Sequence, residues 1–362
     1  MTPNLTSTQT PWIHSYSEII DVRSESEFAE DHIPGAINLP VLNDPQREKV
    51  GTIYKQVDPF TARKIGAALV AQNIATHLTA HFANKDKNYS PLVYCWRGGQ
   101  RSHSMATVLS QIGWKVTLLE GGYKTYRAYV REQLAELPRQ FSYQVLCGPT
   151  GSGKTYLLRS LASRGFQVLD LEALAQHRGS LLGEAWTTAL DHPDRPSTPL
   201  SQPSQKYFES LLLQQLQHFD PSKPVWVESE SNKIGQLYLP PTLWQQMKSA
   251  SCIAIELPLA SRIQWLLHEY PHLMARPERL KRKLQWLTPR YGHKKLNQWY
   301  SLIDRHQWEI LVTDLLADHY DPTYERSLQH YYPNIAQIIQ LPDLSTASFE
   351  VFFQAVERGI SS

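Results

Sequence analysis

One eight-residue segment constrains the fold of this chain more than any other. Residues 148–155 read Gly-Pro-Thr-Gly-Ser-Gly-Lys-Thr and match the pattern G-x-x-x-x-G-K-[ST] at every constrained position. The apolar run 143–146 before the segment predicts a strand, and residues 154–163 after it predict a helix. In that setting the glycines let backbone N–H groups turn toward phosphate oxygens. The sequence therefore predicts an α/β domain that binds a phosphate compound.

The residues of this loop have separate expected tasks. Lys154 supplies a positive charge for the phosphate oxygens, and the Thr155 hydroxyl can bind Mg²⁺. The residues expected to hold the phosphate compound are Gly148, Gly151, Ser152, Gly153, Lys154 and Thr155. The pattern does not decide which compound binds, or whether ATP or GTP is used.

An acidic residue near the metal is expected at the end of a neighbouring strand. The apolar run 224–227 leads into Glu228, which we expect at the metal or in its water shell. Asp170 follows the run 166–169 and is the competing candidate. The sequence alone does not separate the two.

A second loop carries a cysteine. Residues 95–102 read Cys-Trp-Arg-Gly-Gly-Gln-Arg-Ser and lie between the apolar run 92–94 and a helical pattern. A thiol at a strand end that faces a helix N-terminus meets backbone N–H groups, and Arg97 and Arg101 add positive charge, so the thiolate of Cys95 is favoured. The same loop can hold an anion of phosphate size. The alternative is an inert buried thiol, which the two arginines and two glycines argue against.

The other two cysteines, Cys147 and Cys252, lie in apolar strand contexts, where free cysteines are usually small buried residues. Three widely spaced cysteines do not suggest a disulfide framework or a zinc site, so we expect a reducing, cytoplasmic compartment. Residues 1–11 lack the features of a secretory signal and are expected to form a frayed tail. No apolar run reaches the roughly 20 residues of a membrane span, so no membrane partner is expected.

The length of 362 residues favours two domains. Alternating strand and helix patterns predict one α/β domain at 12–137 and a second at 143–345 with a helical C-terminal part, separated near Pro138. Four prolines between residues 191 and 203 predict a loop.

A basic stretch lies between Arg276 and Lys295, where eight Lys or Arg residues accompany one acid, Glu278. Cations that neutralise phosphates, together with interleaved aromatic rings such as Trp286, are typical of RNA binding. A solvated helix face is the alternative. The residues expected to contact RNA are Arg178, Arg279, Lys281, Arg282, Lys283, Arg290, Tyr291, Lys294 and Lys295.

Three segments of the first domain resemble the rhodanese superfamily. Residues 21–25 (Asp-Val-Arg-Ser-Glu) with 32–40 look like its amino-terminal signature, and 119–124 (Leu-Glu-Gly-Gly-Tyr-Lys) look like its closing one. Asp31 stands where a glycine is common. The seven residues from Cys95 to Arg101 exceed the six of simple sulfurtransferase loops and share the C-x5-R spacing of rhodanese-fold phosphatases, which suits a tetrahedral phosphate-like ligand.

The order of a rhodanese-like domain followed by a P-loop NTPase-like domain resembles the tRNA 2-selenouridine synthases over nearly the whole chain. Further matching strings lie at 170–175, 177–180, 202–206 with 208–209, 227–231, and 291–292 with Lys294. The resemblance implies a tRNA substrate with 2-thiouridine at the wobble position of its anticodon stem-loop. It also implies the co-substrates selenophosphate and geranyl diphosphate, with an S-geranylated intermediate, and no tightly bound cofactor. Cys95, Arg97 and Arg101 would then act in selenium transfer, and Lys154 would hold a diphosphate.

Two other functional classes stay open from the sequence. One is a small-molecule kinase fused to a sulfurtransferase, which would turn over ATP without tRNA. The other is a phosphatase or RNA-binding regulator that uses the C-x5-R loop, for which loss of aryl phosphate hydrolysis in Cys95→Ser would be diagnostic. A protein that supplies selenophosphate as a partner, and the oligomeric state, are likewise left open.

Overall fold

The computed structural model describes residues 5–184 and 200–360, and the predicted loop at 191–203 lies mostly outside these ranges. The chain divides into two compact units, Met1–Gln133 with Ser204–Gln214, and Leu134–Pro203 with Gln215–Ser362. Within the described residues, no helix is both long and apolar enough to cross a membrane.

The first unit is built on a parallel five-stranded sheet in the order β1-β5-β4-β2-β3. Its strands are β1 (Leu5–Thr8), β2 (Ile19–Asp21), β3 (Ile37–Asn38), β4 (Leu92–Tyr94) and β5 (Val116–Leu119). Its helices are α1 (Glu25–Glu30), α2 (Asp44–Gln56), α3 (Pro59–Thr79), α4 (Gln100–Ile112) and α5 (Tyr123–Glu136), the last of which runs into the second unit.

The expectation of a frayed tail at residues 1–11 was wrong for residues 5–8. These residues form the edge strand β1, which pairs with β5 in parallel from Leu5 opposite Val116 to Thr8 opposite Leu119. The short, polar strand has no apolar alternation, so its own sequence gives little strand signal. The free edge of β5 decides its conformation by offering backbone hydrogen bonds.

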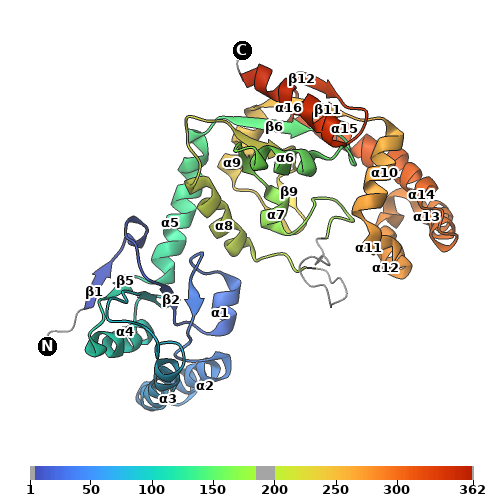
Figure 1. Cartoon of the computed structure of the whole chain (residues 1–362). Helices are drawn as coiled ribbons and strands as arrows, with labels where there is room; N and C mark the ends of the chain where they lie inside the picture. Colours follow the sequence, from blue (N-terminus) through green and yellow to red (C-terminus); the bar gives the residue numbers. More distant parts are fainter. Residues whose placement is uncertain (1–4, 185–199, 361–362) are drawn as a thin grey trace. The chain divides into compact units, whose positions relative to one another are not determined.

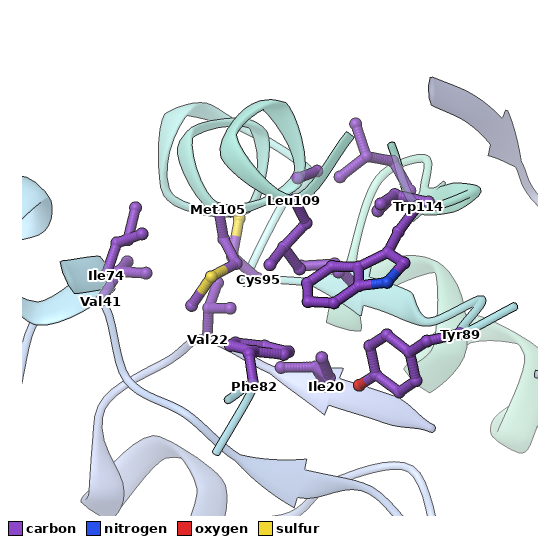
Figure 2. Packing of buried hydrophobic residues seen from close by; sticks show 14 residues of the cluster. Ile20, Val22, Val41, Ile74, Phe82, Tyr89, Cys95, Met105, Leu109 and Trp114 are labelled. Carbon is purple, nitrogen blue, oxygen red and sulfur yellow. The ribbon is translucent and has the colours of Figure 1, made fainter. Parts of the chain in front are cut away.

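Apolar side chains of β2, β4, β5 and α4 form the core of the first unit. Cys95 belongs to this cluster with Val22, Met105 and Leu109 (Figure 2), and only 3% of its surface is exposed. The strand before the cysteine is fully buried, and β4 therefore places the residue at the carboxyl edge of the sheet with its side chain turned inward.

The second unit is also built on a parallel five-stranded sheet, in the order β12-β11-β6-β8-β7. Its strands are β6 (Tyr143–Cys147), β7 (Gln167–Leu169), β8 (Val225–Glu228), β11 (Ser251–Glu256) and β12 (Ile335–Gln340), with a separate hairpin of β9 (Lys233–Ile234) and β10 (Leu237–Tyr238). Helices α6 (Lys154–Ser163), α7 (Leu171–Ala175), α9 (Pro241–Ser249) and α16 (Thr346–Ile360) accompany the sheet. The α/β class and the helical C-terminal part predicted from the sequence are confirmed.

The helical part has a core of its own. Its helices are α10 (Leu259–Glu269), α11 (Pro271–Met274), α12 (Pro277–Leu284), α13 (Thr288–Asp304), α14 (Trp308–Leu315) and α15 (Asp321–Tyr331) (Figure 1). Leucines from these helices and Trp299, which is fully buried, form a separate hydrophobic cluster. The helices are thus packed on one another independently of the sheet.

Helix α8 (Gln205–Gln217) follows the second unit's first strands in sequence, but its residues 205–214 pack with the first unit. Ser210 donates a hydrogen bond to Asp31 at 2.8 Å, and Tyr123 donates to the other oxygen of the same carboxylate at 2.7 Å. Asp31 therefore anchors this helix, which gives a structural reason for an acid where rhodanese-like sequences commonly have glycine.

Candidate active sites

The phosphate-binding loop connects β6 to α6 as the sequence predicts. Gly148 lies so close to its surroundings that a Cβ there would come within 2.5 Å of Ser152 Oγ and 3.0 Å of the Ile255 carbonyl oxygen. A side chain at this position would displace the loop. The glycine thus lets the loop fold tightly at the carboxyl end of the central strand.

Lys154 is the first residue of α6. Its Nζ donates a hydrogen bond to the Gly148 carbonyl oxygen at 2.5 Å and lies 5.4 Å from the centre of the Tyr324 ring. The Tyr324 hydroxyl in turn accepts from the Gly148 N–H at 2.5 Å. The lysine ammonium therefore lies against the loop backbone, where phosphate oxygens are expected.

Three glutamates gather beside Thr155. Its hydroxyl lies 2.9 Å from Glu172 Oε2 and 3.0 Å from Glu228 Oε2, and carboxylate oxygens of Glu172, Glu228 and Glu230 lie within 4.8 Å of one another. A hydroxyl has one proton to donate, so it satisfies one carboxylate at a time. Among the described residues, Glu228 Oε1 is buried without a hydrogen-bond partner. The arrangement needs protons or a cation to balance its charge.

The electrostatics agree with this requirement. Burial, reinforced by the charges of Glu172 and Glu230, raises the pKa of Glu228 well above its usual value. Burial likewise raises the pKa of Glu172, and it raises that of Glu230 to about 8. Oxygen ligands of this kind fit Mg²⁺, which Thr155 Oγ1 and Glu228 would hold, directly or through water.

Of the two acids proposed from sequence, the structure brings Glu228 to Thr155 and leaves Asp170 apart from it. The Asp170 carboxylate accepts from the Ala173 N–H at 2.8 Å as the N-cap of α7, and it pairs with Arg159 at 2.8 Å. The sheet order explains the difference, because β8 is the direct neighbour of β6 whereas β7 is one strand further away.

Sequence reasoning missed Glu172 and Glu230. Both lie two residues from an acid that was considered, in the segments 170–175 and 227–231. Glu172 reaches Thr155 because α7 begins at Leu171 and its first turn faces the loop. The clustering of acids after two neighbouring strands was the available signal.

A cavity of about 480 Å³ opens over the phosphate-binding loop. Its walls include Lys154, Thr155, the three glutamates, Arg159 and Arg178. Arg178 pairs with Glu269 at 2.9 Å and lies over the Tyr270 ring, 5.0 Å from its centre. Arg178, which was expected to bind RNA, thus lines the cavity over the phosphate-binding loop.

The cysteine loop of the first unit is held by the closing rhodanese-like segment. Tyr123 N–H donates to the Cys95 carbonyl oxygen at 2.8 Å, and Lys124 N–H donates to that of Trp96 at 3.2 Å. Gly122 has φ +61°, and a Cβ there would clash with the Cys95 carbonyl oxygen. The cysteine loop and the segment 119–124, which are separate in the sequence, are therefore hydrogen-bonded to each other in the structure.

The polar neighbours of the Cys95 sulfur are Ser102 Oγ at 3.2 Å and the Gly99 carbonyl oxygen at 3.9 Å. Of the two arginines expected nearby, Arg101 pairs with Glu27 at 2.7 Å and Arg97 is exposed to solvent. Since Gly99 is the N-cap of α4, the sulfur lies at the helix N-terminus as predicted.

The basic stretch contains both paired and exposed cations. Arg279 and Lys283 pair with Glu184, Lys281 with Glu278 and Asp304, and Lys295 with Asp314 and Asp318. Arg282, Arg290 and Lys294 are exposed, and 78% of the Trp286 surface is exposed as well.

Tyr291 was proposed as an RNA contact, but it is a packed residue. Its hydroxyl donates to the Asp318 carbonyl oxygen at 2.9 Å, and its ring meets that of Trp299 edge-on. The hydroxyl and ring of Tyr291 are thus engaged by contacts within the helical part.

The domain models of two known families match this chain. Residues 9–129 match the rhodanese-like domain, and residues 141–285 match the tRNA 2-selenouridine synthase AAA domain. Both matches include the loop that the geometry singles out in the respective unit.

Relatives named tRNA 2-selenouridine synthase are similar over much of the chain. The protein of Nitrosomonas europaea is 35% identical over 256 residues, which are 70% of this chain and 63%, less than two thirds, of that protein. The protein of Shewanella denitrificans is 32% identical over 342 residues, 86% of this chain and 88% of that one. The protein of Alcanivorax borkumensis is 31% identical over 342 residues, 86% and 89% of the two chains. With both domains matched and a relative aligned over most of its length, this chain belongs to the tRNA 2-selenouridine synthase family.

Proposed function

We propose that this protein replaces the sulfur of 2-thiouridine at the wobble position of tRNA with selenium from selenophosphate, in the cytoplasm. In the first step the base sulfur bonds to the first carbon of geranyl diphosphate, and diphosphate leaves. In the second step the selenium of selenophosphate bonds to carbon 2 of the base while the geranylated sulfur departs as geranyl thiol, and water then cleaves the selenium–phosphorus bond and releases phosphate. The observation that carries the proposal is the alignment to a family member over 86% of this chain, with a cysteine loop and a phosphate-binding loop both intact.

The phosphate-binding loop would serve the geranylation step. Diphosphate gains negative charge as it leaves, and donors fixed in advance in a partly closed cavity stabilise such charge best. The amides of the loop and the Lys154 ammonium would supply that stabilisation. Bound at Thr155 and Glu228, Mg²⁺ would neutralise further charge on the diphosphate.

The cysteine loop would serve the selenium-transfer step. The N-terminus of α4 offers backbone N–H groups to an anion such as selenophosphate, and Arg97 is exposed where it can approach it. Cys95 would act in this step beside the bound selenophosphate, and Ser102 would hold its sulfur in place by the contact at 3.2 Å. Arg101, already paired with Glu27, would steady the loop.

The exposed cations of the basic stretch would bind the tRNA backbone. Arg282, Arg290 and Lys294 are exposed to solvent, where phosphates can reach them, and Arg290 also donates to the Thr323 hydroxyl at 3.0 Å. The exposed ring of Trp286 offers a surface on which an unstacked base can lie.

The test is mass spectrometry of wobble uridines from cells that lack the protein and carry wild type, Cys95→Ser or Lys154→Ala. We expect 2-selenouridine to disappear in the deletion and to return with wild type. Cys95→Ser should keep S-geranyl-2-thiouridine but lose selenation, whereas Lys154→Ala should lose both products. Unchanged 2-selenouridine in the deletion would refute the function, and intact geranylation in Lys154→Ala would refute the assignment of the diphosphate to this loop.

A further inference from the structure

A second cavity of the helical part, of about 80 Å³, adjoins the cavity over the phosphate-binding loop. The two share five lining residues, so the two cavities meet at these residues. These shared residues are Thr150, Ser180, Leu266, Tyr270 and Tyr320.

The lining changes sharply at the boundary. Beyond the shared residues the second cavity is walled by leucines with one methionine, one valine and one tryptophan. The residues are Leu182, Leu267, Leu273, Met274, Leu280, Trp308, Leu311, Val312, Leu315 and Leu316. The first cavity contains instead Lys154, Arg159, Arg178 and the glutamates.

Two tyrosines separate the polar from the apolar side. The Arg178 guanidinium lies over the Tyr270 ring, 5.0 Å from its centre, and both Tyr270 and Tyr320 line the polar as well as the apolar cavity. Tyrosine suits such a boundary because it joins an apolar ring to a polar tip. A polar cavity and an apolar cavity that meet at these residues fit a molecule with an anionic head and an apolar chain.

We infer that the apolar cavity holds the hydrocarbon chain of the prenyl diphosphate whose diphosphate lies at the phosphate-binding loop. The inference rests on the function proposed above, because that function supplies the head group. Small apolar cavities in proteins stay dry and bind apolar groups. A nucleotide base would leave its polar edges without partners among these leucines.

The size of the cavity limits the length of the chain. A single water needs roughly 10–15 Å³ on this measure, so 80 Å³ admits on the order of five to eight carbon-sized groups. That volume suits the distal five-carbon unit of a ten-carbon chain, with the proximal unit between Leu266 and the two tyrosines. Fifteen-carbon chains should not fit.

Val312 on α14 allows a direct test. It lines the apolar cavity and is only half-buried, so Val312→Phe narrows the space without replacing a fully buried core residue. Ile310→Phe is the matched control, because Ile310 lies on the same helix, is 51% exposed and does not line this cavity. The probes are inorganic pyrophosphate and the dimethylallyl, geranyl and farnesyl diphosphates, measured by calorimetry on the full chain with Mg²⁺.

Wild type and Ile310→Phe should bind geranyl diphosphate at least tenfold more tightly than pyrophosphate, as roughly expected from burial of several methylene groups. Val312→Phe should lose most of this preference for geranyl diphosphate over pyrophosphate. Its affinity for pyrophosphate should stay unchanged, and this result would also show that the variant is folded. Met274→Trp, a second narrowing variant, should behave alike. Leu311→Ala should gain affinity for farnesyl diphosphate.

Two results would overturn the inference, and they differ in what they imply for the proposed function. Prenyl diphosphates that bind no more tightly than pyrophosphate, or a chain-length preference unaffected by Val312→Phe and Met274→Trp, would remove the cavity's role but leave the head-group site standing. Failure of wild type to bind any diphosphate would refute the proposed use of the phosphate-binding loop and the inference with it.

Discussion

At the scale of single residues, three glutamates determine how the phosphate cavity responds to pH. Burial raises the pKa of Glu172, Glu228 and Glu230 in the folded state, and that of Glu230 to about 8. Between about 4.5 and 8 the folded protein therefore retains a proton on Glu230 that the unfolded chain has released. The stability from this group is fully present at low pH and is lost as pH rises through 8.

Glu230→Gln removes this ionisation but keeps the shape of the side chain. We expect the melting temperature of the variant to fall less than that of wild type between pH 5 and 8. Relative to wild type, its free energy of unfolding should rise by at least about 1 kcal/mol over this range. Added Mg²⁺ should raise the melting temperature of wild type at pH 8 more than that of the variant. Glu278→Gln, at an exposed position, is the control. Parallel melting curves for wild type and Glu230→Gln at all pH values would contradict the expectation.

Gly122 gives a prediction for the cysteine loop. Gly122→Ala meets both an unfavourable positive φ and a clash with the Cys95 carbonyl oxygen, whereas Gly35→Ala meets a positive φ of +82° in open space. Backbone strain lowers the free energy of unfolding by roughly 1 kcal/mol in both variants, and the clash lowers it by about 1–3 kcal/mol more in Gly122→Ala. Gly122→Ala should melt lower than Gly35→Ala and lose selenation while it retains geranylation. Equal effects of the two substitutions on selenation would argue against a fitted loop.

At the scale of secondary-structure elements, α10 supports the phosphate-binding loop through Arg262. This buried guanidinium donates to the Thr150 carbonyl oxygen at 2.9 Å and pairs with Asp321, the first residue of α15, at 2.6 Å. One side chain therefore joins the loop to two helices of the helical part.

Arg262→Ala should loosen this connection. Loss of one partner from a buried ion pair costs about 3–5 kcal/mol, and partial exposure of Asp321 lowers the figure to roughly 2 kcal/mol. We expect a lower melting temperature and weaker pyrophosphate binding by calorimetry, with little rescue by Arg262→Lys because lysine cannot reach both partners with a planar fork. Lys281→Ala removes an exposed pair and should leave both readouts unchanged. Full pyrophosphate affinity in Arg262→Ala would show that the loop holds its shape without α10.

At the scale of the whole molecule, the formal net charge of +2 gives little general attraction to RNA. Affinity for tRNA must then come from local cations that are not already neutralised by acids. The exposed Arg282, Arg290 and Lys294 meet this condition, whereas Lys281, Lys283 and Lys295 are paired.

Two triple-alanine variants separate these groups. Replacement of the exposed three should weaken tRNA binding and reduce the slope of log affinity against log salt by roughly 2, since each lost phosphate contact accounts for roughly 0.7–0.9. Replacement of Lys281, Lys283 and Lys295 should change the slope less and lower the melting temperature more. Filter binding between low and moderate salt measures both. The reverse order of slopes would place the tRNA elsewhere.

The sequence by itself determined the local architecture. Strand β4 and helix α6 have the predicted bounds. The G-x-x-x-x-G-K-[ST] pattern predicts its loop because the required backbone conformation depends on residues adjacent in the chain. The position of Cys95 between β4 and α4 was predicted for the same reason. Such features depend on near neighbours, and near neighbours are visible in sequence.

Only the tertiary structure decided which distant residues meet. The strand order brought Glu228 rather than Asp170 to Thr155, and a free sheet edge turned residues 5–8 into a strand. Ion pairs cancelled several cations of the basic stretch, and packing of separate helices formed the apolar cavity. These outcomes depend on contacts between segments far apart in the chain, whose energies are settled only when the whole core is packed.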